Sequence, residues 1–165
     1  MFEINAKVSH PEYGACKIID ICELNLTGKA MQYYRLEPYN SISDTVYIPV
    51  ETAEKIGLRH LISKKQALTL LNSLPDAEEE WSSDFSAKQK RYRTIFADNS
   101  VESLQETFSA MSAIIKWKNQ KELRIKDKIM LENIQKKVMP ELALVLDMTV
   151  SDVIHQAEKL ILQAQ

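Results

Sequence analysis

Glycine is scarce in this chain of 165 residues: only Gly14, Gly28 and Gly57 occur. Three isolated glycines cannot build the glycine-rich loop that surrounds phosphates in nucleotide-binding proteins. No apolar run approaches the roughly 18 residues of a membrane span, and the first residues lack the basic and apolar segments of a signal peptide. We therefore expect a cytoplasmic protein without a membrane segment.

Cysteine is scarce too, because the chain has only Cys16 and Cys22. A second pair of ligands that would complete a four-ligand zinc site is therefore missing. Their even spacing within a strand-like run predicts two buried free thiols on one face of a strand. The three histidines, His10, His60 and His155, lie in a turn, a connector and a terminal helix without ligand-like spacing. We expect no metal, no cofactor and no catalysis, because no reactive constellation is found.

The hydrophobic fraction of 45% and the charged fraction of 27% are those of an ordinary soluble globular protein. The formal net charge of -2 argues against a protein that coats nucleic acid by bulk charge. Its distribution is uneven, because residues 88–137 carry twelve Lys/Arg against six Asp/Glu. This basic middle suits a local phosphate-facing patch, and the alternative is a set of helices with solvated outer faces.

The first 50 residues have the short runs and turn residues of a β structure. We predict strands over residues 15–22, 31–37 and 45–50, with a loop over 38–44. Closely spaced short strands of this kind indicate a small barrel or a strongly bent sheet.

From residue 51 the apolar spacing changes to that of helices. A short helical turn over 51–56 ends at Gly57, and Ser63 caps a helix that ends before Pro75. Further helices are predicted over 86–97, 101–115 and 125–139, and Thr149 caps the last one. Pro140 is expected to break or bend the helix that it enters.

These elements predict an α+β protein with two domains. Residues 1–58 form a small β domain, 59–85 a bridging helix and hinge, and 86–165 an all-α helical bundle.

The stretch from Glu78 to Arg93 is the best candidate for a functional surface, because it mixes aromatic and basic residues. Aromatic rings can stack on bases or wedge between them while cations contact phosphates. Trp81 is open to two interpretations, a core residue that joins the bridging helix to the bundle or a wedge. The acidic run of residues 78–80 is interpreted as a solvated hinge.

Three segments resemble the N-terminal domain of the CarD/CdnL transcription regulators: Val8 to Ile21, Tyr33 to Pro38 and Val46 to Arg59. Lys90 to Arg93, Met130-Leu131 and Glu141 to Leu146 are similar to the helical domain of that family. The similarity is strong in the first 60 residues and patchier after them.

The resemblance implies a Tudor/SH3-like β-barrel, shared with transcription-repair coupling factors, that binds the β-subunit lobe of bacterial RNA polymerase. It also implies a helical domain at the upstream edge of the melted promoter, where a tryptophan enters the minor groove and cations contact phosphates. The implied DNA-binding residues are Trp81, Lys88, Lys90, Arg91, Arg93, Lys136 and Lys137. The implied polymerase-binding residues are Leu24, Tyr33, Tyr47, Ile48 and Pro49.

The chain departs from the family pattern at several positions. Asn5-Ala6 stands where the family has Gly-Asp, and Leu24 and Tyr47 stand at positions that are often basic. Trp81 precedes Arg91 by ten residues, which is further than the family tryptophan, so Phe85 is the alternative wedge.

We therefore expect a monomeric transcription regulator that binds RNA polymerase and stabilises the promoter open complex through weak, sequence-independent DNA contacts. The alternative is an adapter that binds polymerase or another partner without touching DNA.

Overall fold

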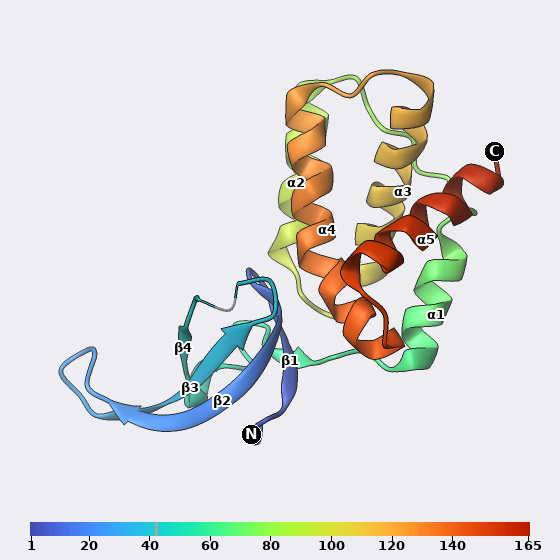
Figure 1. The fold of residues 1–165 in the computed structure, drawn as a ribbon. Helices are drawn as coiled ribbons and strands as arrows, with labels where there is room; N and C mark the ends of the chain where they lie inside the picture. Colours follow the sequence, from blue (N-terminus) through green and yellow to red (C-terminus); the bar gives the residue numbers. More distant parts are fainter. Residues whose placement is uncertain (42) are drawn as a thin grey trace.

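The structure is a computed structural model, which describes residues 1–41 and 43–165, and it has a β unit (residues 1–62) beside a helical unit (63–165) (Figure 1). The strands of the described chain are β1 (Lys7–His10), β2 (Gly14–Leu24), β3 (Met31–Pro38), β4 (Val46–Pro49) and β5 (Arg59–His60). They form one five-stranded antiparallel sheet in the order β4-β3-β2-β1-β5. Because β4 and β5 are the two edges, the sheet is open, and the predicted closure into a barrel is not observed.

A β-bulge in β2 changes which face of the sheet each side chain joins. Ile18 pairs with Leu36 and Asp20 pairs with Arg35, so Ile19 is the extra residue. Cys16 therefore lies in the buried core of the β unit, whereas Cys22 is half-buried on the opposite face. The prediction that both thiols share a face is wrong, because one extra residue reverses the alternation.

The hairpin of β2 and β3 extends away from the helices beyond the end of β4 (Figure 1). The predicted loop over 38–44 contains residue 42, which lies outside the described residues. After β4, the chain makes a 3-10 turn over Val50–Thr52, and Gly57 follows with a φ of 97°. This positive φ agrees with the predicted helical stop at Gly57.

The described part of the helical unit contains α1 (Lys64–Ser73), α2 (Phe85–Ala97), α3 (Leu104–Gln120), α4 (Ile125–Leu146) and α5 (Val150–Gln163). The two predicted caps are confirmed. The Ser63 side chain accepts from Gln66 N in a capping box, and the Thr149 side chain accepts from Asp152 N.

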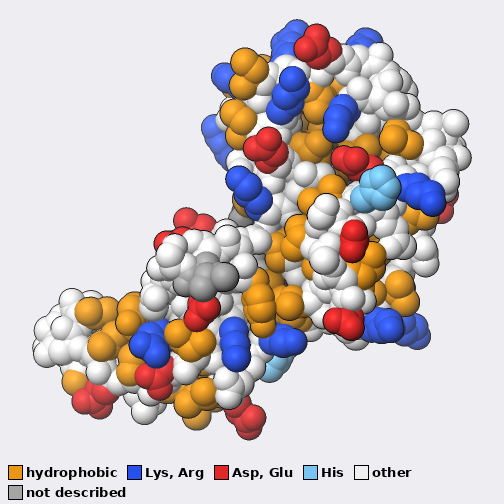
Figure 2. All heavy atoms as spheres, viewed as in Figure 1, with side chains coloured by type: hydrophobic (Ala, Val, Ile, Leu, Met, Phe, Trp, Pro, Cys, Tyr) orange, Lys and Arg blue, Asp and Glu red, His pale blue; other side chains and the backbone are white. Residues whose placement is uncertain are grey.

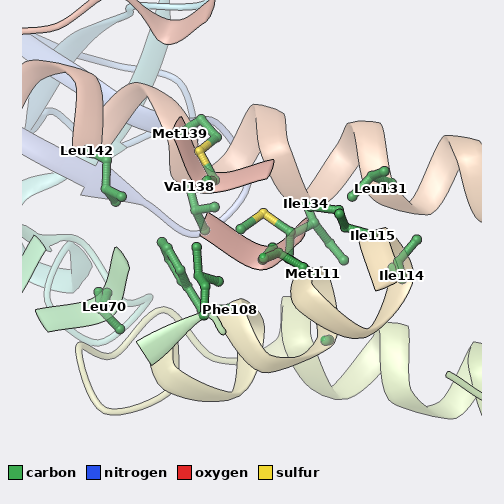
Figure 3. Close-up of a cluster of buried hydrophobic side chains, with 14 of the residues drawn as sticks. Leu70, Phe108, Met111, Ile114, Ile115, Leu131, Ile134, Val138, Met139 and Leu142 are labelled. Carbon is green, nitrogen blue, oxygen red and sulfur yellow. The ribbon is translucent and has the colours of Figure 1, made fainter. Parts of the chain in front are cut away.

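One apolar core joins the helices of this unit. Phe108 and Met111 of α3 face Ile134 and Val138 of α4, and Leu70 of α1 approaches the same core (Figure 3). Because Leu70 and its neighbours in α1 are buried there, the segment predicted as a bridge belongs to the core of the helical unit.

Pro140 does not end α4, which continues to Leu146. Proline has no N–H group, so the carbonyl of Lys136 four residues earlier loses its helical donor. Asn40 of the β unit donates to that carbonyl through Nδ2 at 2.7 Å. The two units therefore meet where the helix has a free acceptor.

Candidate functional site

The outer face of the sheet, opposite the core of the β unit, carries a row of apolar side chains. We call it the outer sheet face and define it by Leu24, Met31, Tyr33, Tyr47 and Pro49. The strand register brings Tyr33 beside Pro49 and Leu24 beside Met31. Tyr47 is 44% exposed, Leu24, Met31 and Pro49 are half-buried, and Tyr33 is buried.

Ile48 was grouped with these residues by the resemblance, and the structure separates it from them. Its side chain points to the opposite face and is buried with Ile18 and Tyr34 in the core of the β unit. Alternation along β4 explains the difference, because successive side chains of a strand point to opposite faces. Ile48 is therefore a core residue.

Arg35 lies in the outer row between Asp20 and Tyr47. Its Nε is buried without a hydrogen-bond partner among the described residues. A buried donor without an acceptor has a cost of about 1–3 kcal/mol, so this group makes the β unit less stable than a paired donor would.

Trp81 lies in the core of the helical unit and is only 5% exposed. Its Nε1 donates to Oδ1 of Asp127 at 3.3 Å. Nζ of Lys88 is 2.9 Å from the same carboxylate oxygen and 5.9 Å from the centroid of the Trp81 ring. This buried triad of Trp81, Lys88 and Asp127 supports the core interpretation of Trp81. Trp81 and Lys88, which the resemblance implies as DNA-contacting groups, are both buried in this structure.

Arg91 is also engaged within the molecule. Its Nε and Nη2 each donate to Glu79 at 2.8 Å, and its Nη1 donates to Glu106 at 3.0 Å. Hydrogen bonding to Glu79 is the main cause that raises the pKa of Arg91. Two carboxylates thus occupy a guanidinium that was predicted to contact phosphates, and Glu79 has a structural partner rather than belonging to a solvated hinge.

Lys136 and Lys137 are adjacent but have different environments. Lys136 is exposed, whereas Lys137 is buried and donates to the carbonyls of Ile95 and Asp98 at 3.3 Å. Burial lowers the pKa of Lys137, and the nearby charge of Arg59 lowers it further. Lys137, which the resemblance implies as a DNA-contacting residue, is therefore buried in this structure and stabilises the end of α2.

Exposed side chains of α2 and α4 form a surface that we call the α2–α4 face and define by Phe85, Arg93, Lys126, Ile129 and Lys136. Phe85 is 45% exposed at the start of α2, and Nζ of Lys126 lies 4.0 Å from its ring centroid. Ile129 is half exposed one turn after Ile125, which is 75% exposed. Figure 2 shows Lys and Arg side chains with hydrophobic side chains among them on this part of the molecule.

Lys90 and Arg93 of the predicted patch are exposed, and Arg93 follows Phe85 by eight residues on the same side of α2. Lys126 and Ile129 were missed by the sequence analysis. A signal for them exists, because Ile125 and Ile129 fall outside the buried stripe of Leu131, Ile134 and Val138.

A cleft of about 730 Å³ lies between the two units, with His10 and Tyr13 on one wall and Tyr92 and Lys136 on the other. Nδ1 of His10 accepts from the N–H groups of Glu12 and Tyr13 at 3.0 and 3.2 Å. Burial lowers the pKa of His10 below its usual value. A neutral His10 therefore fixes the turn at the edge of the cleft and has a structural role.

Within residues 1–41 and 43–165, no group of three His, Cys, Asp or Glu side chains is arranged to hold a metal ion. None of the helices that the structure describes is long and apolar enough to cross a lipid bilayer.

Residues 2–62 match the family model of the CarD-like/TRCF RID domain. They include all of the described strands and the outer sheet face. The β unit is therefore similar to the RID domain that CarD-like proteins share with transcription-repair coupling factors. No curated protein matches the chain.

Proposed function

We propose that this chain, whose β unit is a CarD-like/TRCF RID domain, binds the β subunit of RNA polymerase and contacts promoter DNA through its helical unit. The polymerase-binding surface in this proposal is the outer sheet face. The DNA-binding surface is the α2–α4 face, with contacts that do not depend on base sequence. The effect of both contacts together is a longer-lived open complex.

The outer sheet face suits a protein partner because it is apolar without being part of the core. Tyr47 offers a large half-exposed ring, and aromatic residues are enriched at the centres of protein interfaces.

Tyr47→Asp is expected to reduce capture of RNA polymerase by the full-length chain at least about tenfold, because a central aromatic contact contributes roughly 2 kcal/mol or more. Tyr39→Asp is the matched control. Tyr39 is 37% exposed, and it follows Pro38, the last residue of β3, so it is not one of the residues that define the outer sheet face. Equal capture by wild type and Tyr47→Asp would exclude the outer sheet face as the polymerase site.

The observation that carries the DNA part is the exposed Phe85 ring with Lys126 above it. A ring at the end of a helix can stack on an unpaired base while the ammonium group contacts the phosphate backbone. Arg93 and Lys136 extend the positive charge along the same face. Few phosphate contacts predict weak binding with only a modest salt dependence, because the salt dependence grows with the number of phosphates contacted.

Phe85→Ala is expected to shorten the open-complex lifetime about fivefold or more. The reason is that one base–aromatic stack contributes about 1–3 kcal/mol, and the lower value corresponds to about a fivefold change. The lifetime is measured with saturating protein, so that polymerase occupancy stays constant. Leu162→Ala is the control, because Leu162 is 39% exposed on α5.

The second candidate function, an adapter that does not touch DNA, is favoured by the buried positions of Lys88 and Lys137. It predicts that Phe85→Ala and the charge reversal Lys126→Glu leave the lifetime unchanged while polymerase capture is retained. The same pair of measurements therefore separates the two functions.

A further inference from the structure

Among the polar contacts that join the β unit to the helical unit, three sets stand out, and we call them together the clamp. They are the hydrogen bonds of Asn99 to Ser9 and Gly57, the Arg59–Glu141 ion pair, and the bond from Asn40 to the Lys136 carbonyl. Each contact uses a group that is buried or that has lost its own local partner.

Asn99, between α2 and α3, is 5% exposed, and all the hydrogen bonds of its side chain to described residues go to the β unit. Nδ2 donates to the carbonyls of Gly57 at 2.9 Å and Ser9 at 3.1 Å, and Oδ1 accepts from Oγ of Ser9 at 3.3 Å. The Asn99 carbonyl also accepts from Nε of Arg59. Ser9 and Arg59 are paired residues of β1 and β5, so one edge of the sheet meets this asparagine.

Arg59 and Glu141 form a two-point ion pair, with Nη1–Oε1 at 2.7 Å and Nη2–Oε2 at 3.1 Å. Glu141 is only 1% exposed, and its Oε1 also accepts from the N–H of Ile62 at 2.8 Å. Removal of one partner of such a pair leaves a buried charge without compensation. The planar guanidinium also fixes the orientation of Arg59 relative to the Glu141 carboxylate, because both N–H···O bonds must form together.

Beside the clamp, the backbone of the β unit approaches α4 closely next to Pro140. A Cβ atom on Gly14 would lie 2.8 Å from the Lys137 carbonyl oxygen and 3.5 Å from that of Lys136. The turn of the β unit therefore approaches the helix as closely as only glycine permits, and Gly14 has the positive φ of 69° that the turn needs.

We propose that the clamp makes the two units one rigid, cooperative body, with Asn99, Arg59 and Glu141 as the positioning residues that set the angle between them. The rigid coupling follows from these contacts alone. Its consequence rests on the proposed function: the angle fixes where the α2–α4 face lies once the outer sheet face is bound to polymerase.

The chain contains a separate probe for each unit. Both tryptophans, Trp81 and Trp117, lie in the helical unit, so their fluorescence reports its unfolding. Cys16 is fully buried in the β unit, and burial raises its pKa to about 12. In a Cys22→Ser background, reaction of Cys16 with a thiol reagent therefore reports opening of the β unit.

The experiment compares urea midpoints from these two probes in the full-length chain. Before any clamp substitution the two midpoints are expected to coincide, because the units unfold together. Asn99→Ala combined with Glu141→Gln should move the Cys16 midpoint below the tryptophan midpoint by about 1 M urea or more, since a small β unit has little stability of its own. Glu158→Gln is the control, because it removes an exposed ion pair with Lys118 inside the helical unit.

Two results would overturn the coupling: different urea midpoints for the two probes in the unaltered chain, or equal midpoints in the clamp variant.

Open-complex lifetimes test the consequence. The clamp variant should capture polymerase normally and shorten the lifetime at least about threefold, a difference of about 0.7 kcal/mol. An unchanged lifetime with separated midpoints would overturn the positioning role. If Phe85→Ala has no effect while the midpoints behave as expected, the proposed DNA contact fails and the rigid body stands.

Discussion

Asp127→Ala is expected to lower the free energy of unfolding by about 3–5 kcal/mol, because it leaves the ammonium group of Lys88 buried without a counterion. Lys88 and Asp127 are 5% and 2% exposed, so water cannot replace the lost partner in the folded protein. The indole N–H of Trp81 loses its acceptor in the same step. Urea unfolding followed by tryptophan fluorescence measures the change.

Two further variants separate the buried charge from simple loss of packing. Glu158→Ala, which removes the exposed pair with Lys118, should change the free energy of unfolding by no more than about 0.5 kcal/mol. The double variant Asp127→Ala/Lys88→Met should recover much of the loss, because apolar replacement of a buried ion pair is often neutral. A loss under about 1 kcal/mol for Asp127→Ala alone would contradict the burial of the pair.

Local signals in the sequence predicted much of the fold, because they depend on neighbours in the chain. Ser63 and Thr149 cap helices through residues three positions later, and both caps are present. The apolar spacing of Phe108 and Ile134 likewise places them in the core without any knowledge of the partner helix. The β unit was also accessible through its resemblance, since the family match covers residues 2–62.

Features that depend on tertiary contacts could not be predicted in the same way. The β-bulge at Ile19 has no local sequence signal, yet it moves Cys22 to the opposite face from Cys16. Lys88 and Lys137 look like exposed cations in sequence, but a distant carboxylate and distant carbonyls satisfy them in the folded chain. A periodic pattern places a residue on a helix face, and it does not say which distant groups meet that face.

The proline of α4 shows how a local defect can become an interface. Sequence reasoning predicted that Pro140 would break or bend the helix, because it removes one N–H donor. The helix continues, and Asn40 from the β unit supplies the missing donor to the Lys136 carbonyl. A change that costs stability in an isolated helix therefore gives the other unit a specific place to bind.

Trp81→Ala is expected to lower the free energy of unfolding by about 3–5 kcal/mol, as for other buried tryptophans, because it opens a cavity in the helical core. Phe85→Ala should change it by about 0.5 kcal/mol or less, since the Phe85 side chain is 45% exposed. Urea unfolding followed by helical circular dichroism measures both variants. The two aromatic residues, four positions apart, should thus have opposite profiles in stability and in function.

The open-complex lifetime then decides which ring contacts DNA. Trp81→Leu keeps part of the apolar volume and removes the aromatic ring, so a folded variant should give the wild-type lifetime, whereas Phe85→Ala should shorten it about fivefold. The comparison is made without urea, at a temperature where both variants are fully folded. If Trp81→Leu shortened the lifetime while its fold remained intact, Trp81 would have to leave the core to reach DNA, and the buried triad would be a state that the promoter complex opens.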